Sequence, residues 1–313
     1  MLRFSLHFLT ACLLLIHASL VRADVVPDVL PGFRTVMAQG ASSIALDIDN
    51  DSLLMNRNDG FYTSGVRVTQ QSAMRNAAQL VTYGWRIGHE MYSASDIKLQ
   101  SAQVQALDHP YAAWLYGGLF REVRQVDGAY TRIGFDLGCI GPCAAGERVQ
   151  TNLHRLINQP LPQGWSGQVK NEFGAVLYGD VAPARWSLQP WLDVQPSIRG
   201  RFGNIFTDVT AAVTLRAGAL GDLPAASTRH LYLKFGARAV GHDASLQGGY
   251  FSRGNPHTVR PQRLVAEAEA GLQWVQGPFA LLAAIVRRGN EIRDLPAAAG
   301  AQNFVRLQLV YFP

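Results

Sequence analysis

Apolar and polar residues alternate along most of this chain, and the alternation predicts β-strands. Near the end of the chain, Val305, Leu307 and Leu309 share one face of a strand, while Arg306 and Gln308 share the other. A two-residue period is typical of a sheet with one apolar and one polar face. The pattern indicates twelve strands, at about 42–51, 61–72, 81–92, 111–124, 128–139, 165–179, 184–197, 204–217, 228–241, 261–275, 278–290 and 302–312.

The length of these segments favours strands that cross a membrane obliquely. The chain has 313 residues, of which 48% are hydrophobic and 16% are charged. No stretch after residue 23 reaches the roughly 20 consecutive apolar residues that a transmembrane helix requires. We therefore predict an all-β protein, a twelve-stranded antiparallel transmembrane β-barrel with its apolar residues facing lipid. A soluble β-sandwich or barrel also alternates and is the alternative.

The first 23 residues have the features of a signal peptide. Arg3 is followed by a mostly apolar run, and Val21-Arg22-Ala23 is an acceptable cleavage site. We predict that residues 24–313 form one exported outer-membrane barrel domain, with 24–41 as a short irregular lead-in. An oxidising compartment favours a disulfide between Cys139 and Cys143.

The charge of the chain gives little information about its partners. Removing Arg3 and Arg22 lowers the formal charge from +5 to +3, which is a faint preference for anionic partners. Lysine and arginine are not clustered as they are in nucleic-acid-binding proteins, so we expect no nucleic-acid partner.

An even number of strands places both ends of the chain on the periplasmic side of the barrel. The connections after odd-numbered strands then face outward, and most of the longer connections fall in this set, as in outer-membrane barrels. They lie at about 52–60, 93–110, 140–164, 198–203, 242–260 and 291–301.

One stretch, 148–172, departs from the alternation and predicts a short helix in an outward-facing loop. Its apolar residues recur at helical spacing, and polar residues four apart form a second stripe beside them. The apolar stripe comprises Val149, Leu153, Leu156 and Ile157, and the polar stripe comprises Gln150, His154 and Asn158. Pro160 and Pro162 end the helix.

The predicted topology brings polar residues from three distant stretches to the outer rim. The first strand ends at Asn50 and Asp51, the second begins near Thr63, and the loop helix carries His154. Oxygen ligands such as those of Asn50, Asp51 and Thr63 suit Ca²⁺. A Ca²⁺ beside a histidine predicts ester hydrolysis, in which the ion polarises the carbonyl and the imidazole deprotonates water. Gln150 would orient the imidazole or the water.

Each of these features also has a purely structural interpretation. Asn-Asp after a strand is a common turn, and Tyr62-Thr63-Ser64-Gly65 suits an aromatic belt residue followed by polar filler. A single histidine on a loop helix is commonly packed or solvated. The residues by themselves leave the catalytic and the structural interpretations open.

An ordered set of short motifs resembles the outer-membrane lipid A 3′-O-deacylase family. The motifs run over most of the mature chain: Asp49-Asn50-Asp51, Asp59, Tyr62-Thr63-Ser64-Gly65, Met91-Tyr92-Ser93, Asp108 through Tyr116, Gly138, Gly141-Pro142, Gln150, His154, Pro162, Gly164-Trp165, Gln168, Glu172, and Phe235-Gly236 through Gly248.

The resemblance implies a barrel enzyme that removes the 3′-linked acyloxyacyl chain of lipid A in a Ca²⁺-dependent reaction. It implies a site at the outer rim, facing the extracellular side, between the barrel wall and the loop helix. In that site His154 is the catalytic base and Gln150 its polar neighbour, while Asn50, Asp51 and Thr63 bind the metal or shape the site. The implied partners are lipopolysaccharide and the Gram-negative outer membrane, and we expect a monomer.

The chain departs from the family pattern at three places. The family's Arg-Pro-Tyr-Ala-Gly reads His109-Pro110-Tyr111-Ala112-Ala113, and Ser64 replaces an asparagine. The stretch 158–160 lacks the acidic residue that members can carry after the helix histidine.

Two other functions stay open. A non-catalytic barrel would be a pore or a lipopolysaccharide-binding scaffold. An outer-membrane phospholipase would need a His–Ser pair on the barrel wall. No clear pair is visible in the sequence, and Ser64 is a candidate for its serine.

Overall fold

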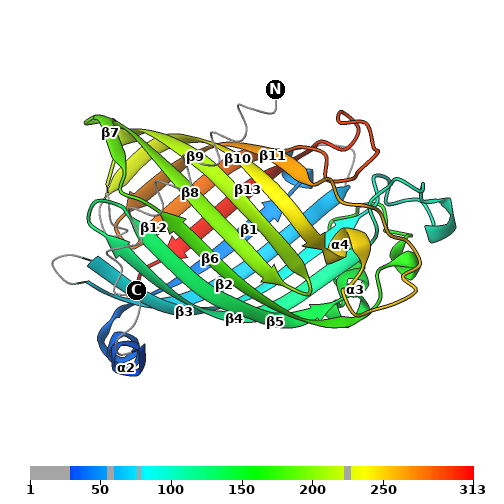
Figure 1. Cartoon of the computed structure of the whole chain (residues 1–313), viewed down its shortest axis with the longest axis horizontal. Coiled ribbons are helices and arrows are strands. Elements are labelled where there is room, and N and C mark those ends of the chain that lie inside the picture. The colour runs from blue at the N-terminus through cyan, green and yellow to red at the C-terminus, as the bar shows by residue number, and fades with distance from the viewer. Residues whose placement is uncertain (1–28, 55–59, 76–78, 222–226) are drawn as a thin grey trace.

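The computed structural model describes residues 29–54, 60–75, 79–221 and 227–313. The predicted signal peptide, residues 1–23, and the motif residue Asp59 lie outside these described residues. Within them, one antiparallel sheet contains all the assigned strands (Figure 1). They are β1 (Ala41–Asn50), β2 (Phe61–Arg75), β3 (Gln79–Ser93), β4 (Ala112–Gln125), β5 (Tyr130–Ile140), β6 (Glu172–Ala182), β7 (Trp186–Gln189), β8 (Leu192–Gly203), β9 (Phe206–Ala219), β10 (Thr228–Asp243), β11 (Leu264–Gln276), β12 (Phe279–Arg288) and β13 (Gln302–Tyr311).

The sheet closes into a barrel at two places where strands distant in sequence pair. β1 pairs with β13, with Ile44 opposite Tyr311, and β6 pairs with β8, with Val176 opposite Gly203. The short strand β7 pairs with the beginning of β8 and is an extra ribbon beside the ring. The twelve remaining strands form the closed ring, which confirms the predicted fold class.

The alternation along each strand separates a lipid-facing surface from a polar lumen. On β6, Phe173 and Leu177 are exposed while Tyr178 and Asp180 are buried. The same holds for β10, where Leu231 and Phe235 are exposed. A ribbon that is apolar outside and polar inside satisfies every backbone group in lipid, because closure removes all sheet edges.

Ion pairs and aromatic side chains occupy the lumen. Arg86 donates two hydrogen bonds to Asp136, at 2.9 and 2.7 Å, and Arg288 pairs with Glu267 at 2.8 Å. The space left between the lumen side chains amounts to about 440 Å³. Towards one end the lumen is filled by a cluster that includes Tyr62, Trp114, Phe206 and Phe304. A lumen crossed by side chains in this way does not favour the pore alternative.

The structure corrects the predicted boundaries of two strands. The prediction started a strand at residue 165, but residues 165–167 form a short 3₁₀ turn, η4, and β6 begins at Glu172. The segment 184–197 is not one strand, because the chain turns between β7 and β8. β8 then runs through 198–203, which was predicted as an outward loop. The alternation of lumen-facing and lipid-facing residues continues in this segment. Arg199 forms an ion pair with Asp180, and Arg201 forms an ion pair with Asp208 in the lumen.

Helices mark the two ends of the barrel. The predicted irregular lead-in contains a helix, α2 (Val29–Gln39), which contacts β2 and β3, and Phe33 packs edge-on against Tyr83. Helices α3 (Gly146–Leu156) and α4 (Ala244–Gln247) lie at the opposite end (Figure 1). We call this end, which also carries the long connections after β3, β5, β10 and β12, the loop end. No α-helix in the described part of the chain has the length and apolar composition needed to cross a membrane.

Candidate active site on the outer wall

The predicted loop helix is confirmed as α3, between β5 and β6. Glu147 in its first turn and Arg155 in its last turn suit the helix dipole. Its buried residues are Gly146, Gln150 and His154, spaced four apart. Gln150 and His154 of the predicted polar stripe therefore pack against the protein, whereas Asn158, which lies beyond the end of the helix, is exposed, as is the apolar stripe.

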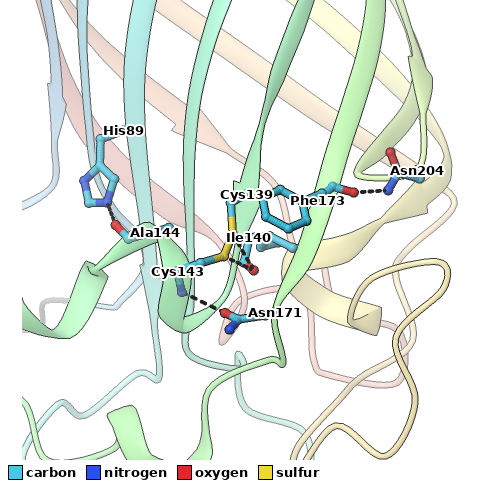
Figure 2. The surroundings of a disulfide bond; sticks show 8 residues. All are labelled: His89, Cys139, Ile140, Cys143, Ala144, Asn171, Phe173 and Asn204. Atoms are coloured by element: carbon cyan, nitrogen blue, oxygen red, sulfur yellow. Dashed lines mark hydrogen bonds between the residues drawn. A yellow bond between two sulfur atoms is a disulfide. The ribbon is translucent and has the colours of Figure 1, made fainter.

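Three contacts fix the start of α3 to the outside of the barrel wall. On β3, His89 lies on the same face as the exposed Ile87, and its Nε2 is 2.9 Å from the carbonyl oxygen of Ala144. The amide of Gly141 donates to the carbonyl of Ala113 on β4 at 3.0 Å. A disulfide joins Cys139 to Cys143 (Figure 2). These contacts hold the helix start on the lipid side of β3, β4 and β5.

A small apolar cluster forms the floor between α3 and the wall. It consists of Met91, Ala94, Tyr111, Ala113, Ala144 and Trp165. Position 146 requires glycine, since an added Cβ would lie 2.5 Å from the Cβ of Ala113 and 2.5 Å from the Trp165 ring. The close approach brings the buried face of α3 directly onto the wall.

Gln150 is held in this interface by Trp165. The indole Nε1 of Trp165 donates to the Gln150 Oε1 at 2.8 Å, and the Gln150 side chain is 1% exposed. This bond orients the amide, so its Nε2 carries both remaining donors. That buried Nε2 has no hydrogen-bond partner among the described residues. A buried amide donor without a protein partner is suited to a substrate oxygen.

His154 is oriented by the backbone just after its own helix. Its Nδ1 is 2.6 Å from the carbonyl oxygen of Pro160. A carbonyl can only accept, so Nδ1 carries the proton. In the neutral imidazole Nε2 then carries the lone pair and is the basic nitrogen. Pro160 therefore does more than end the helix, because its carbonyl selects the tautomer that general-base catalysis requires.

The end of β1 and the start of β2 supply the oxygen-bearing residues. The Asn50 Oδ1 accepts from the hydroxyl of Ser52 at 2.5 Å and from the amide of Leu53 at 3.2 Å. The Oδ2 of Asp51 accepts from the amide of Gly60 at 3.0 Å, and the amide of Asp51 donates to the carbonyl of Thr63 at 3.5 Å.

A bulge changes the direction of Thr63. The pairing of β2 with β3 shifts between Tyr62 and Ser64, so Thr63 is an extra residue on its strand. Its hydroxyl lies 2.6 Å from the hydroxyl of Ser93, which has the same parity as Met91 on the outer face of β3. The two hydroxyls therefore meet on the side of the wall that α3 covers.

Strand register connects the two halves of the site. Asn50 pairs with Ser64, Ser64 with Met91, and Met91 with Ala113, against which α3 packs. Neighbouring strands lie about 4.8 Å apart. This row of paired residues shows that the residues from β1 and β2 lie on the same outer surface as the buried face of α3, near the loop end of the barrel. The structure thus places Asp51 beside Thr63 and Gln150 beside His154.

The oxygen groups fit the chemistry of a calcium ion, and they include one carboxylate. Asp51, Thr63 and Ser93 offer carboxylate and hydroxyl oxygens, which are the ligand types that Ca²⁺ takes. Asp51 is the single acid in this set, and fewer charged ligands mean weaker binding. Asn50 already accepts two hydrogen bonds, so its role as a ligand stays a prediction. Among the described residues no group of three or more His, Cys, Asp or Glu side chains is placed to hold a metal.

Comparison with known proteins identifies the family. A family model described as outer membrane protein LpxR matches residues 8–311. The chain belongs to the LpxR family. It is therefore an outer-membrane barrel of the lipid A deacylase family, which confirms the resemblance and the predicted location. No curated protein sequence matches the chain.

Two solved structures resemble this LpxR-family barrel in fold. LpxR from Salmonella typhimurium has a TM-score of 0.72 at 20% sequence identity, covering 87% of this chain and 100% of that chain. The beta domain of the Bordetella autotransporter BrkA has a TM-score of 0.51 at 11% identity, covering 88% of this chain and 100% of that chain.

The segment that departs from the LpxR-family pattern forms a rigid corner beside the site. Asp108 accepts from the amide and the hydroxyl of Ser95, at 2.8 and 2.7 Å. His109 is 1% exposed, stacks on Tyr92 with centroids 5.4 Å apart, and hydrogen-bonds through Nδ1 to the Pro110 carbonyl. Burial lowers the pKa of His109, and its stacking and hydrogen bond make this histidine a packing residue.

Sequence reasoning left three residues of this region without a role. Trp165, which orients Gln150, and Ser93 were each quoted within a motif without a function. His89 was not singled out. Its signal is weak but real, because a histidine on the lipid-facing parity of a strand requires a polar partner.

Proposed function

We propose that this LpxR-family chain is a lipid A 3′-O-deacylase, a carboxylic ester hydrolase that removes the 3′-linked acyloxyacyl chain of lipopolysaccharide in the outer leaflet, facing the extracellular side. The observation that carries the proposal is the bond from the His154 Nδ1 to the Pro160 carbonyl. It fixes the tautomer of a buried imidazole whose basic nitrogen is Nε2, one helical turn from the amide donor of Gln150.

The reaction follows from these groups. His154 Nε2 removes a proton from water, and the water oxygen bonds to the ester carbonyl carbon. The Pro160 carbonyl stabilises the imidazolium that forms, because Nδ1–H already points at it. The bond between carbonyl carbon and sugar oxygen then breaks. His154 returns its proton to that oxygen, which releases a sugar hydroxyl and an acyloxyacyl fatty acid.

The remaining residues position the ester. The Gln150 Nε2 is suited to donate to the carbonyl oxygen, where negative charge develops. Asp51 and Thr63, with Ser93 beside them, would hold Ca²⁺, and Asn50 caps the turn that carries Asp51. When bound, the ion would supply a positive charge that polarises the ester carbonyl. A set with one carboxylate predicts calcium affinity in the weak part of the usual range, about 10⁻⁴–10⁻³ M.

Mass spectrometry of lipid A from cells that express the protein tests the proposal. Wild-type protein should yield lipid A that lacks one acyloxyacyl group, and His154→Ala should lower the rate by about 10²–10⁴-fold. Asn152→Ala, at an exposed position on α3, is the matched control and should keep full activity. A fully active His154→Ala would exclude the mechanism.

A chelator tests the metal, and the lipid product tests the reaction class. Removing Ca²⁺ should abolish activity, and adding Ca²⁺ should restore it. The Asp51→Asn variant should need a higher Ca²⁺ concentration than the wild type to reach the same activity. Lysophospholipid in place of deacylated lipid A would instead show a phospholipase. An unchanged lipid pool would show a non-catalytic scaffold.

A further inference from the structure

Helix α3 exposes its apolar stripe and buries the stripe that contains Gln150 and His154. Gln150 is 1% and His154 7% exposed, whereas Leu156 is 83% and Ile157 50% exposed. Val149 and Leu153 are exposed as well. A surface helix in water shows the opposite arrangement, with its apolar stripe facing the core. The inversion is stable where the surrounding medium is lipid.

The position of the helix start is consistent with a lipid environment. Ala144, two residues before α3, contacts His89 on the lipid-facing side of β3, and β3 continues four residues further to Ser93. At about 3.3 Å per residue, this contact lies roughly 13 Å along the strand below its loop-end terminus. The outward residues of the strands nearby, Leu115, Leu137 and Phe173, are exposed and apolar. The apolar stripe of α3 is therefore continuous with the lipid-facing wall.

The two arginines of α3 lie on a third side. With 3.6 residues per turn, the apolar stripe is centred roughly 75° from the buried face, and Arg148 and Arg155 lie roughly 135° beyond the stripe. Both arginines are exposed. A helix with an apolar edge and a basic side is typical of one that lies in the plane of a membrane interface.

We propose that α3 is embedded in the outer leaflet, with the stripe Val149, Leu153, Leu156 and Ile157 in contact with acyl chains and Arg148 and Arg155 at the anionic headgroups. The space between α3 and the wall then opens sideways into the leaflet. Lipid reaches Gln150 and His154 laterally, without passing through water or the lumen. This placement depends only on the barrel being in a membrane, and its consequence for substrate entry rests on the proposed function.

Electron paramagnetic resonance accessibility tests the placement without any catalysis. A nitroxide is attached in turn to Leu156→Cys on the apolar stripe and to Arg155→Cys on the basic side, in proteoliposomes that contain lipopolysaccharide. Cys139 and Cys143 are joined to each other and do not take the label. Oxygen, which concentrates in acyl chains, should relax the label at 156 more than a water-soluble nickel chelate does. The label at 155 should show the reverse. Nickel dominance at both positions would overturn the proposal.

A second copy of the chain is the competing occupant of the stripe. It would appear as spin–spin broadening between labels at 156 that disappears when labelled protein is diluted with unlabelled protein, and this result would also overturn the proposal. Absence of broadening together with oxygen dominance supports it.

Kinetics test the consequence for substrate entry. Leu156→Asp should raise KM for lipid A in vesicles by about tenfold or more, the loss expected for one leucine side chain withdrawn from lipid. Its kcat and its rate on a short water-soluble ester should be unchanged, and Asn152→Asp is the control. A wild-type KM in Leu156→Asp would refute lateral entry. If neither substrate is cleaved by wild-type protein, the proposed function fails, while the resonance result still decides the placement.

Discussion

The barrel has two buried polar regions, and they are built in different ways. In the lumen, charged groups face groups of opposite charge, as in the pair between Arg86 and Asp136. Under α3 the buried groups are mostly neutral, and the structure holds them by backbone carbonyls and one indole. The lumen therefore satisfies its charges and gains rigidity. The outer wall instead places the His154 imidazole and the Gln150 amide between α3 and the barrel, in the site that we propose for catalysis.

The largest expected effect separates stability from catalysis. Arg86 also lies over the Tyr178 ring, 3.9 Å from its centroid. Arg86→Met would leave Asp136 buried without its partner, and removing one partner of a buried pair costs about 3–5 kcal/mol. We expect that loss in the free energy of unfolding by denaturant in detergent, with kcat per folded molecule unchanged. Arg260→Met, which breaks the exposed pair with Asp294, is the control and should cost at most about 1 kcal/mol. A large fall in kcat for Arg86→Met would show that the two regions are coupled.

Gln150 sharpens the comparison from the side of the outer wall. Gln150→Glu keeps an acceptor for the Trp165 indole but removes both Nε2 donors, whereas Gln150→Leu removes acceptor and donors together. If Nε2 binds the ester carbonyl, both variants should lower kcat by about 10²-fold, measured by release of fatty acid. Wild-type activity in Gln150→Glu alone would mean that Gln150 only holds Trp165 in place.

The disulfide should affect the wall site more than the barrel. It closes a loop of five residues, Cys139 to Cys143, for which the chain-entropy relation gives roughly 2 kcal/mol. Replacing both cysteines by serine should loosen the start of α3 and lower kcat several-fold, and it should lower the free energy of unfolding of the barrel by at most about 2 kcal/mol. A reductant should have the same effect on wild-type protein and none on the double-serine variant. His89→Ala, which removes the bond to Ala144, should add to the loss.

The smallest expected effect is a local dependence on pH at the loop end. Burial lowers the pKa of His109, although Glu291, Asp243 and Asp108 oppose this shift. The unfolded segment binds a proton more readily than the folded one, so its stability is complete above the unfolded pKa of about 6.5. That stability is lost as the pH falls towards the lowered pKa that His109 has in the folded protein. Hydrogen exchange of residues 94–111, corrected for intrinsic rates, should therefore be faster at pH 5 than at pH 7. His109→Asn should remove the difference, and a flat profile in the wild type would contradict it.

The sequence alone determined the barrel. The two-residue alternation indicates which face of each strand meets lipid. Every strand needs an apolar face towards lipid, whatever its neighbouring strands are, so the pattern is visible in each strand by itself. The helix at 146–156 was visible for the same reason, since its period of 3.6 interrupts the alternation. Where the prediction failed, as at 165–171 and 198–203, the boundary depended on partners elsewhere in the chain. Trp165 packs under α3, and Arg199 and Arg201 reach carboxylates on other strands.

The tertiary structure alone decided the site. The sequence gives α3 an apolar and a polar stripe, but the period of the pattern cannot say which stripe packs against the barrel and which is exposed. That choice depends on where the chain attaches the helix, through His89, Gly141 and the disulfide. The tautomer of His154 and the orientation of Gln150 likewise depend on Pro160 and Trp165. These contacts exist only once β3, β4 and β5 lie side by side, because a hydrogen bond requires a position in space that no local pattern encodes.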